Sequence, residues 1–114
     1  MDIFYALAEP RRRQVIEILA SRGQRSATEI CDEFDVSPQA ISQHLKVLRE
    51  AKVVQMEKRA QQRLYQINPS SMLELEEWTD KVTQLWTKRF DALDKVLAGE
   101  KEKILKEKRG GQDE

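Results

Sequence analysis

Polar and basic side chains recur along one face of a predicted helix over residues 38–51, and this combination suits contact with DNA. Ser37 can cap the helix, and Pro38 fits its first turn because a missing N–H costs little there. The side chains spaced to point inward are Ile41, Leu45 and Leu48. Those left on the outward face are Gln39, Ser42, Gln43, Lys46 and Arg49. Amides and hydroxyls suit base edges and cations suit phosphates, so the pattern predicts a recognition helix.

A shorter helix over residues 27–34 is predicted just before it. Ser26 and Glu29 form the S-x-x-E pattern of a capping box, which satisfies N–H groups at a helix start. Ile30 and Phe34 would give this helix one apolar face. The two residues that follow Phe34 form a tight turn. Two short helices joined in this way are typical of a helix-turn-helix.

The elements that must position this pair can be traced by the same patterns. Helices are predicted over 3–8 and 10–21, and Gly23 fits the C-terminal turn of the second. Apolar and polar residues then alternate in two short runs between residues 53 and 67, which predicts a β-hairpin. Its turn, residues 59–62, lacks Asn-Gly and Asp-Gly, so the turn type stays open.

A long helix is predicted from residue 71 to about 97. Ser71 and Glu74 form a second capping-box pattern at its start. The expected parts of the chain are a DNA-binding domain over 1–98, its dimerisation helix over 70–98, and a charged, partly disordered tail over 99–114.

Charge is unevenly distributed along the chain. The 114 residues carry 20 Lys and Arg against 20 Asp and Glu, so the net charge is zero and argues against a generic polycation. Residues 36–66 nevertheless hold six basic residues against two acidic ones, and they include the candidate recognition helix. The single Cys excludes an internal disulfide. Neither a signal peptide nor a membrane-length apolar run is seen, so a cytoplasmic protein that does not contact membranes is expected.

Large apolar side chains form a stripe along the long helix. They are Leu75, Trp78, Val82, Leu85, Trp86, Phe90, Leu93 and Leu97. The helix would reach about 40 Å, which is more than a domain of this size can cover. We therefore expect a homodimer in which these residues bury one another. Two recognition helices related by a two-fold axis would enter successive major grooves and favour a palindromic operator in double-stranded DNA.

Several of these stretches resemble the winged helix-turn-helix regulators of the ArsR/SmtB type. The matching segments are ALAEPRRRQVIEIL (6–19), SATEICDEF (26–34), VSPQAISQHLKVLREAKVV (36–54) and RLYQI (63–67). The segment 76–97 looks more like the branch that lacks metal sites, sometimes called SdpR-like. The resemblance implies a mainly α fold with a small β-hairpin wing and a long C-terminal dimerisation helix.

The resemblance also implies roles for individual residues. Those matching the base-facing part of the family's recognition helix are Gln39, Ala40, Ser42, Gln43 and His44. Lys46 matches a phosphate contact, and the residues matching the wing are Arg59, Gln62 and Arg63. Alternatively, His44 could lie beside the contact between two helices and have no role in DNA binding. Lys52 stands where the family often has Gly, so a left-handed residue there would cost about 1 kcal/mol or shift the turn.

Cys31 is the candidate residue for redox or metal sensing. Metal-sensing relatives have a pair of Cys in the corresponding helix, whereas Glu33 stands here where the second would be expected. One thiolate cannot hold a soft metal, and Asp32 beside it would raise the thiol pKa. Beside Ile30 and Phe34, a structural Cys is expected. Redox or metal sensing through Cys31 remains the alternative.

Arg11, Arg12 and Arg13 form a basic triplet at the start of a predicted helix, an unfavourable place for cations. Either one contacts phosphate, or one pairs with Glu9 or Glu17 and the others are solvated.

These patterns favour a dimeric, sequence-specific repressor that occludes a promoter, is autoregulatory and is not metal-responsive. A protein-interaction module on the same scaffold is a further alternative, although the polar, basic face argues against it. The sequence holds no nucleophile–base pair, glycine-rich phosphate loop or metal cluster, so neither an enzyme nor a cofactor is expected.

Overall fold

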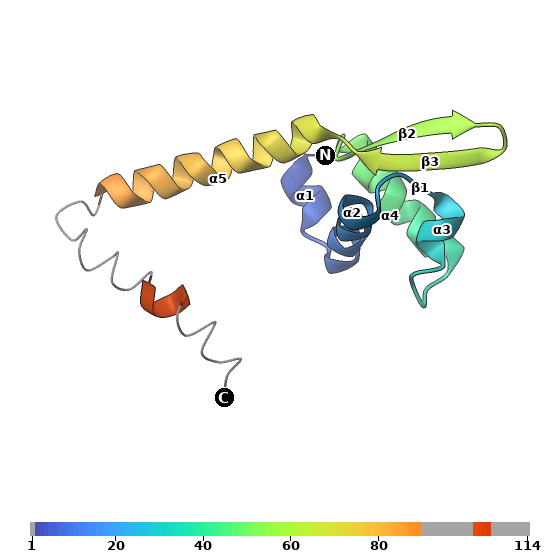
Figure 1. Ribbon diagram of the computed structural model, residues 1–114, viewed down its shortest axis with the longest axis horizontal. Coiled ribbons are helices and arrows are strands. Elements are labelled where there is room, and N and C mark those ends of the chain that lie inside the picture. Colours follow the sequence, from blue (N-terminus) through green and yellow to red (C-terminus); the bar gives the residue numbers. More distant parts are fainter. Residues whose placement is uncertain (1, 90–101, 106–114) are drawn as a thin grey trace. The chain divides into compact units, whose positions relative to one another are not determined.

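The computed structural model describes residues 2–89 and 102–105 (Figure 1). Its elements are α1 (Ile3–Leu7), α2 (Pro10–Arg22), β1 (Arg25–Ser26), α3 (Ala27–Cys31), α4 (Pro38–Glu50), β2 (Val54–Arg59), β3 (Gln62–Ile67) and α5 (Pro69–Arg89). Contacts divide the chain into two compact units, residues 1–75 and 76–114. The predicted interface residues Phe90, Leu93 and Leu97 lie outside the described residues.

The core of the first unit lies between its helices and its small sheet. The largest fully buried side chains are Ile30, Ile41, Leu45, Leu48, Val15 and Val53. The predicted inward face of α4 is therefore confirmed. Because this face is fixed against the core, the opposite face of α4 is presented to solvent.

The two helices of the predicted helix-turn-helix each begin directly after the serine that caps them. The Ser26 hydroxyl accepts from the N–H of Glu29, and the Glu29 carboxylate accepts from the N–H of Ser26, so the capping box is confirmed. The N–H of Ala40 donates to Ser37 Oγ at 3.2 Å, and Pro38 occupies the first turn of α4. Both starts follow from satisfying N–H groups that have no partner within the helix.

The first of these helices is shorter than predicted. α3 ends at Cys31 rather than at Phe34. The N–H groups of Glu33 and Phe34 donate to carbonyls three residues back, at 3.1 Å each, so the chain tightens into turns. Phe34 nevertheless remains half-buried against the core.

α4 ends in a Schellman motif with Lys52 in its left-handed position. The N–H of Val53 donates to the Leu48 carbonyl at 2.9 Å, and that of Lys52 to the Arg49 carbonyl at 3.0 Å. Lys52 has φ of 61°, the conformation that Gly adopts without a steric penalty. Lys52 therefore adopts the left-handed conformation expected at this position, where the family often has Gly.

The predicted hairpin is confirmed, and a third strand joins it. β2 and β3 pair from Val54↔Ile67 to Arg59↔Gln62, and β1 pairs with the other edge of β3. Ala60 has φ of 57° at the first central position of the two-residue turn, as in a type II′ turn. The strand β1 was not predicted, because two residues show no periodicity.

The start of α5 differs from the prediction. The helix begins at Pro69 instead of Ser71, and the Asn68 side chain accepts from the N–H of Ser70 at 3.2 Å. Ser71 is buried, and its hydroxyl donates to the Asn68 carbonyl at 2.7 Å. The predicted Ser71–Glu74 capping box is therefore wrong, because Pro69 already occupies the first turn. Within the described residues, no helix combines the length and apolar character needed to cross a membrane.

Candidate DNA interface

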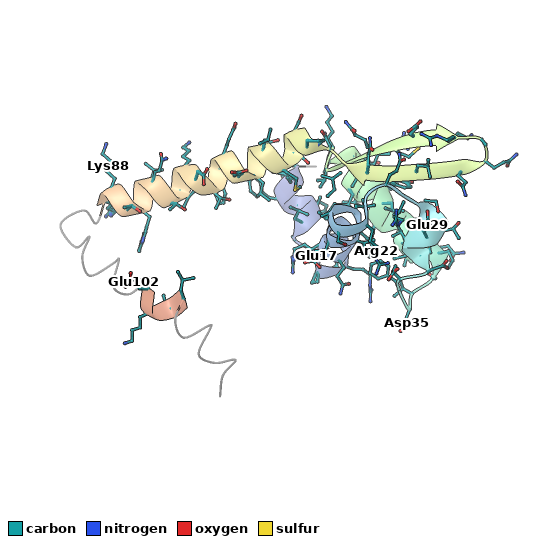
Figure 2. The ribbon with its side chains drawn as sticks, in the orientation of Figure 1. Glu17, Arg22, Glu29, Asp35, Lys88 and Glu102 are labelled. Atoms are coloured by element: carbon teal, nitrogen blue, oxygen red, sulfur yellow. The ribbon has the colours of Figure 1, made fainter. Side chains whose placement is uncertain are left out.

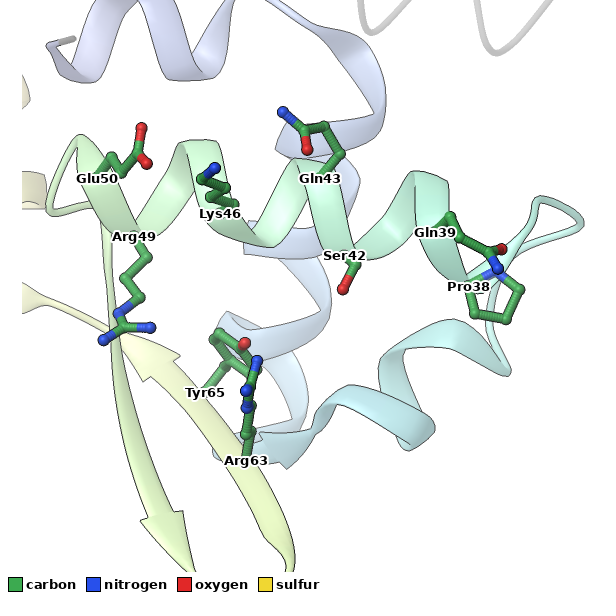
Figure 3. Close-up of a pocket in the computed structure, with 9 residues that line it drawn as sticks. All are labelled: Pro38, Gln39, Ser42, Gln43, Lys46, Arg49, Glu50, Arg63 and Tyr65. Atoms are coloured by element: carbon green, nitrogen blue, oxygen red, sulfur yellow. The ribbon is translucent and has the colours of Figure 1, made fainter.

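An open groove of about 800 Å³ lies between α4 and the wing strand β3. Its lining residues are Pro38, Gln39, Ser42, Gln43, Lys46, Arg49, Glu50, Arg63 and Tyr65. Figure 3 shows Ser42 and Arg49 on the side of α4 that faces Arg63 and Tyr65 of β3. The structure therefore brings together the polar face of the predicted recognition helix and one predicted wing residue.

The chemistry of the groove is polar and mainly cationic. Three cations, Lys46, Arg49 and Arg63, line it against one carboxylate, Glu50. Amide and hydroxyl groups come from Gln39, Ser42 and Gln43, all of them exposed. Exposed cations attract phosphates, and amides can donate and accept at the same base edge. This surface can thus both hold a nucleic-acid backbone and distinguish bases.

Tyr65 is a groove residue that the sequence interpretation missed. It is buried, with 6% of its surface exposed, and it pairs with Met56 and Arg25 in the sheet. Because Arg63 and Tyr65 are two residues apart on β3, they point to the same face of the sheet. This two-residue spacing was the sequence signal that could have placed Tyr65 beside Arg63. Arg49, which the sequence places on the outward face of the helix, also lines the groove, although the family resemblance implies no role for it.

Ala40 and His44 do not line the groove; both are half-buried. His44 Nδ1 lies 3.4 Å from Arg12 Nη1 on α2. Burial, and then the charge of Arg12, lowers the pKa of His44. His44 is therefore held toward its neutral form by its surroundings.

The arginine triplet has a structural role that neither sequence alternative described. Arg12 Nε donates to the Ala6 carbonyl at 2.6 Å, and Arg13 donates to the Leu7 carbonyl at 2.7 Å. These carbonyls belong to the C-terminal end of α1, where helices leave acceptors without partners and carry partial negative charge. Two of the three arginines, at the start of α2, thus donate hydrogen bonds to carbonyls at the end of α1.

Two predicted wing residues lie at the tip of the hairpin. Arg59 and Gln62 face each other across the turn, and both are exposed. Arg59 makes an ion pair with Glu57 at 3.1 Å. The hydrogen bonds from Arg59 and Gln24 lower the pKa of the Glu57 carboxyl. The structure brings neither tip residue into the groove that Arg63 lines.

Cys31 packs against the core from the end of α3 and is half-buried. Burial, and then the neighbouring Asp32, raises the pKa of its thiol, as the sequence indicated. Glu33 forms an ion pair with Arg22. The described part of the chain contains no group of three His, Cys, Asp or Glu side chains arranged to hold a metal ion.

The described part of α5 exposes most of the predicted apolar stripe. The exposed fractions are 51% for Trp78, 42% for Val82, 59% for Leu85 and 56% for Trp86, whereas Leu75 is half-buried. Lys88 lies near the C-terminal end of the helix (Figure 2). Four large exposed apolar side chains on one helix form a patch of the kind found at protein–protein contacts.

Helices α3 and α4, joined by the turns of residues 32–37 and followed by the hairpin β2–β3, define a winged helix-turn-helix domain. A family model described as a helix-turn-helix domain matches residues 7–57. The HTH-type transcriptional regulator Rv2034 of Mycobacterium tuberculosis is 33% identical over 95 residues, 83% of this chain and 85% of that protein. The transcriptional repressor SdpR of Bacillus subtilis is 29% identical over 77 residues, 68% of this chain and 84% of that protein.

A solved crystal structure of an ArsR family transcriptional regulator has the same fold. It shares 30% sequence identity, with a TM-score of 0.68, over 74% of this chain and 86% of that chain. The chain therefore belongs to the ArsR family of winged helix-turn-helix transcriptional regulators.

Proposed function

We propose that this protein is a dimeric, sequence-specific DNA-binding repressor that acts by occluding its own promoter. The groove between α4 and β3 carries the proposal, because it combines base-reading amides with phosphate-binding cations on one fixed helix face. The similarity to a protein named as a transcriptional repressor supports repression, as opposed to activation, as the mode of regulation. The proposed site of action is the cytoplasm.

The proposed contacts keep the roles that the family resemblance implies for each side chain. Base edges are contacted from α4, by Gln39, Ala40, Ser42, Gln43 and His44. Phosphates are contacted by Lys46 and by the wing residues Arg59, Gln62 and Arg63. We add Arg49 to the phosphate contacts, since it lines the same groove as Arg63.

The proposed dimer buries the apolar stripe of α5 against a second copy. A palindromic site follows from this arrangement, because a two-fold axis presents two identical recognition helices to the DNA. The proposal holds that repression does not depend on metal. Cys31 has no thiolate partner, since it is the single Cys of the chain.

The test is the effect of Gln43→Ala on binding to DNA from upstream of the protein's own coding sequence. Removing a base-contacting amide should weaken binding to that duplex by about 1–3 kcal/mol and leave binding to a scrambled duplex nearly unchanged. The matched control is Gln14→Ala, which removes an exposed amide from α2 outside the groove. Equal losses on both duplexes would contradict base reading by Gln43.

A further inference from the structure

The guanidinium of Arg12 connects three parts of the first unit. Its Nε donates to the Ala6 carbonyl at 2.6 Å, and its Nη2 donates to the Tyr5 carbonyl at 3.3 Å. The same group lies over the Tyr5 ring, 5.5 Å from the ring centroid. The remaining nitrogen, Nη1, lies 3.4 Å from His44 Nδ1 on the recognition helix. Three anchors on α1 thus fix the orientation of the nitrogen that reaches α4.

This contact determines which nitrogen of the His44 ring carries the hydrogen. A guanidinium has only donors, so Nδ1 must be the acceptor, and the ring hydrogen must then be on Nε2. We infer that Arg12 is a positioning residue of the recognition helix, which joins the end of α1 to α4 and holds His44 as its neutral Nε2–H tautomer. The inference rests on the proposed function, because its consequence is read in DNA binding.

The charged groups around His44 agree with this assignment. Burial lowers the His44 pKa most, and Arg12 lowers it further; Glu9 raises it, and Arg11 lowers it. All three charged groups belong to α2 or to the residue that caps its start. A proton on His44 would turn the contact with Arg12 into one between two cations, so protonation and the contact exclude each other.

A consequence for DNA binding follows from the position of His44 in the sequence of α4. It lies beside Gln43, which lines the groove. Losing the Arg12 contact removes the polar link between α1 and α4 and lets the imidazole exchange tautomers and protonate. Since one hydrogen bond of this kind is worth about 0.5–1.5 kcal/mol, Arg12→Gln should reduce the cognate-to-scrambled affinity ratio by about two- to tenfold.

The first test is an NMR titration of the imidazole, which is unambiguous because the chain has one His. Arg12→Gln should raise the His44 pKa. The matched control is Arg13→Gln, which removes the same charge and also one bond to an α1 carbonyl, yet does not touch His44. Arg13→Gln should leave the His44 pKa in place. Equal titration curves for the wild type and Arg12→Gln, or equal shifts in both variants, would overturn the inference.

The second test measures the cognate-to-scrambled affinity ratio against pH. In the wild type the ratio should fall as the pH drops through the His44 pKa, and in Arg12→Gln the fall should begin at higher pH. His44→Asn, which cannot titrate, should remove this pH dependence. A ratio that is insensitive to Arg12→Gln, or a pH dependence that survives His44→Asn, would overturn the positioning role.

The two tests separate the possible failures. A protein that binds no DNA specifically would contradict the proposed function, while the NMR titration would still report the Arg12–His44 contact. Circular dichroism establishes that each variant folds. If Arg12→Gln does not fold, Arg12→Lys replaces it in the affinity-ratio test, because a single ammonium keeps the charge but cannot reproduce the three-sided contact.

Discussion

Leu85→Ala provides a quantitative test of the proposed dimer. Leu85 is 59% exposed in the single chain and lies in the apolar stripe of α5. Truncating a fully buried Leu to Ala loses about 2.4 kcal/mol, at about 0.8 kcal/mol per carbon. Scaling by the exposed fraction leaves about 1.4 kcal/mol for each protomer. Because the substitution occurs in both copies, the dimer should lose about 2.8 kcal/mol, or about 100-fold in dissociation constant.

Leu73→Ala is the matched control. Leu73 is the same residue type with nearly the same exposed fraction, 58%, and it also belongs to α5. At 3.6 residues per turn it lies about 120° around the helix from Leu85, away from the stripe. Leu73→Ala should therefore leave the dimer almost unchanged.

The assay is analytical ultracentrifugation over a concentration series for the wild type and both variants. Operator affinity should fall together with dimer affinity for Leu85→Ala. Equal dissociation constants for Leu85→Ala and the wild type, or equal losses for the two variants, would show that the stripe is not the dimer interface.

Three further predictions concern stability and are measured by chemical denaturation. Ser26→Ala removes the capping box and should cost about 1 kcal/mol; an unchanged midpoint would contradict that role. Lys52→Gly should stabilise the protein, by at most about 1 kcal/mol, because Lys52 is left-handed, and a loss of stability would count against strain there. The lowered His44 pKa means that the unfolded chain binds the proton more readily, so stability should fall as the pH drops below about 6.5. This pH dependence should weaken in His44→Gln, and its persistence would assign it to other groups.

Helix α4, the proposed recognition helix, could be predicted from the sequence because several local signals agree there. Ser37 and Pro38 mark its start, and the spacing of the apolar residues gives its inward face. An outward face follows once the inward face is fixed, so the polar side of the groove could be predicted too. The capping box of Ser26 and Glu29 is equally local.

Other features depend on contacts that no local pattern contains. The strand β1 exists because two residues meet the edge of β3. The role of Arg12 depends on the end of α1 and on a histidine 32 positions away along the chain. At the start of α5, two local signals competed, and the conformation fixed by Pro69 prevailed over the Ser71 pattern.

The measurement that tests the central claim most directly is binding of the purified protein to its own upstream DNA. Fluorescence anisotropy would compare this fragment with a scrambled duplex at several salt concentrations, with and without zinc and a thiol oxidant. We expect tight binding to the native fragment alone, unaffected by zinc or oxidant. Loss of that binding with zinc or oxidant would instead make Cys31 a sensor. Equally weak binding to both duplexes, falling steeply with salt, would reflect phosphate contact alone and would contradict sequence-specific repression of its own promoter.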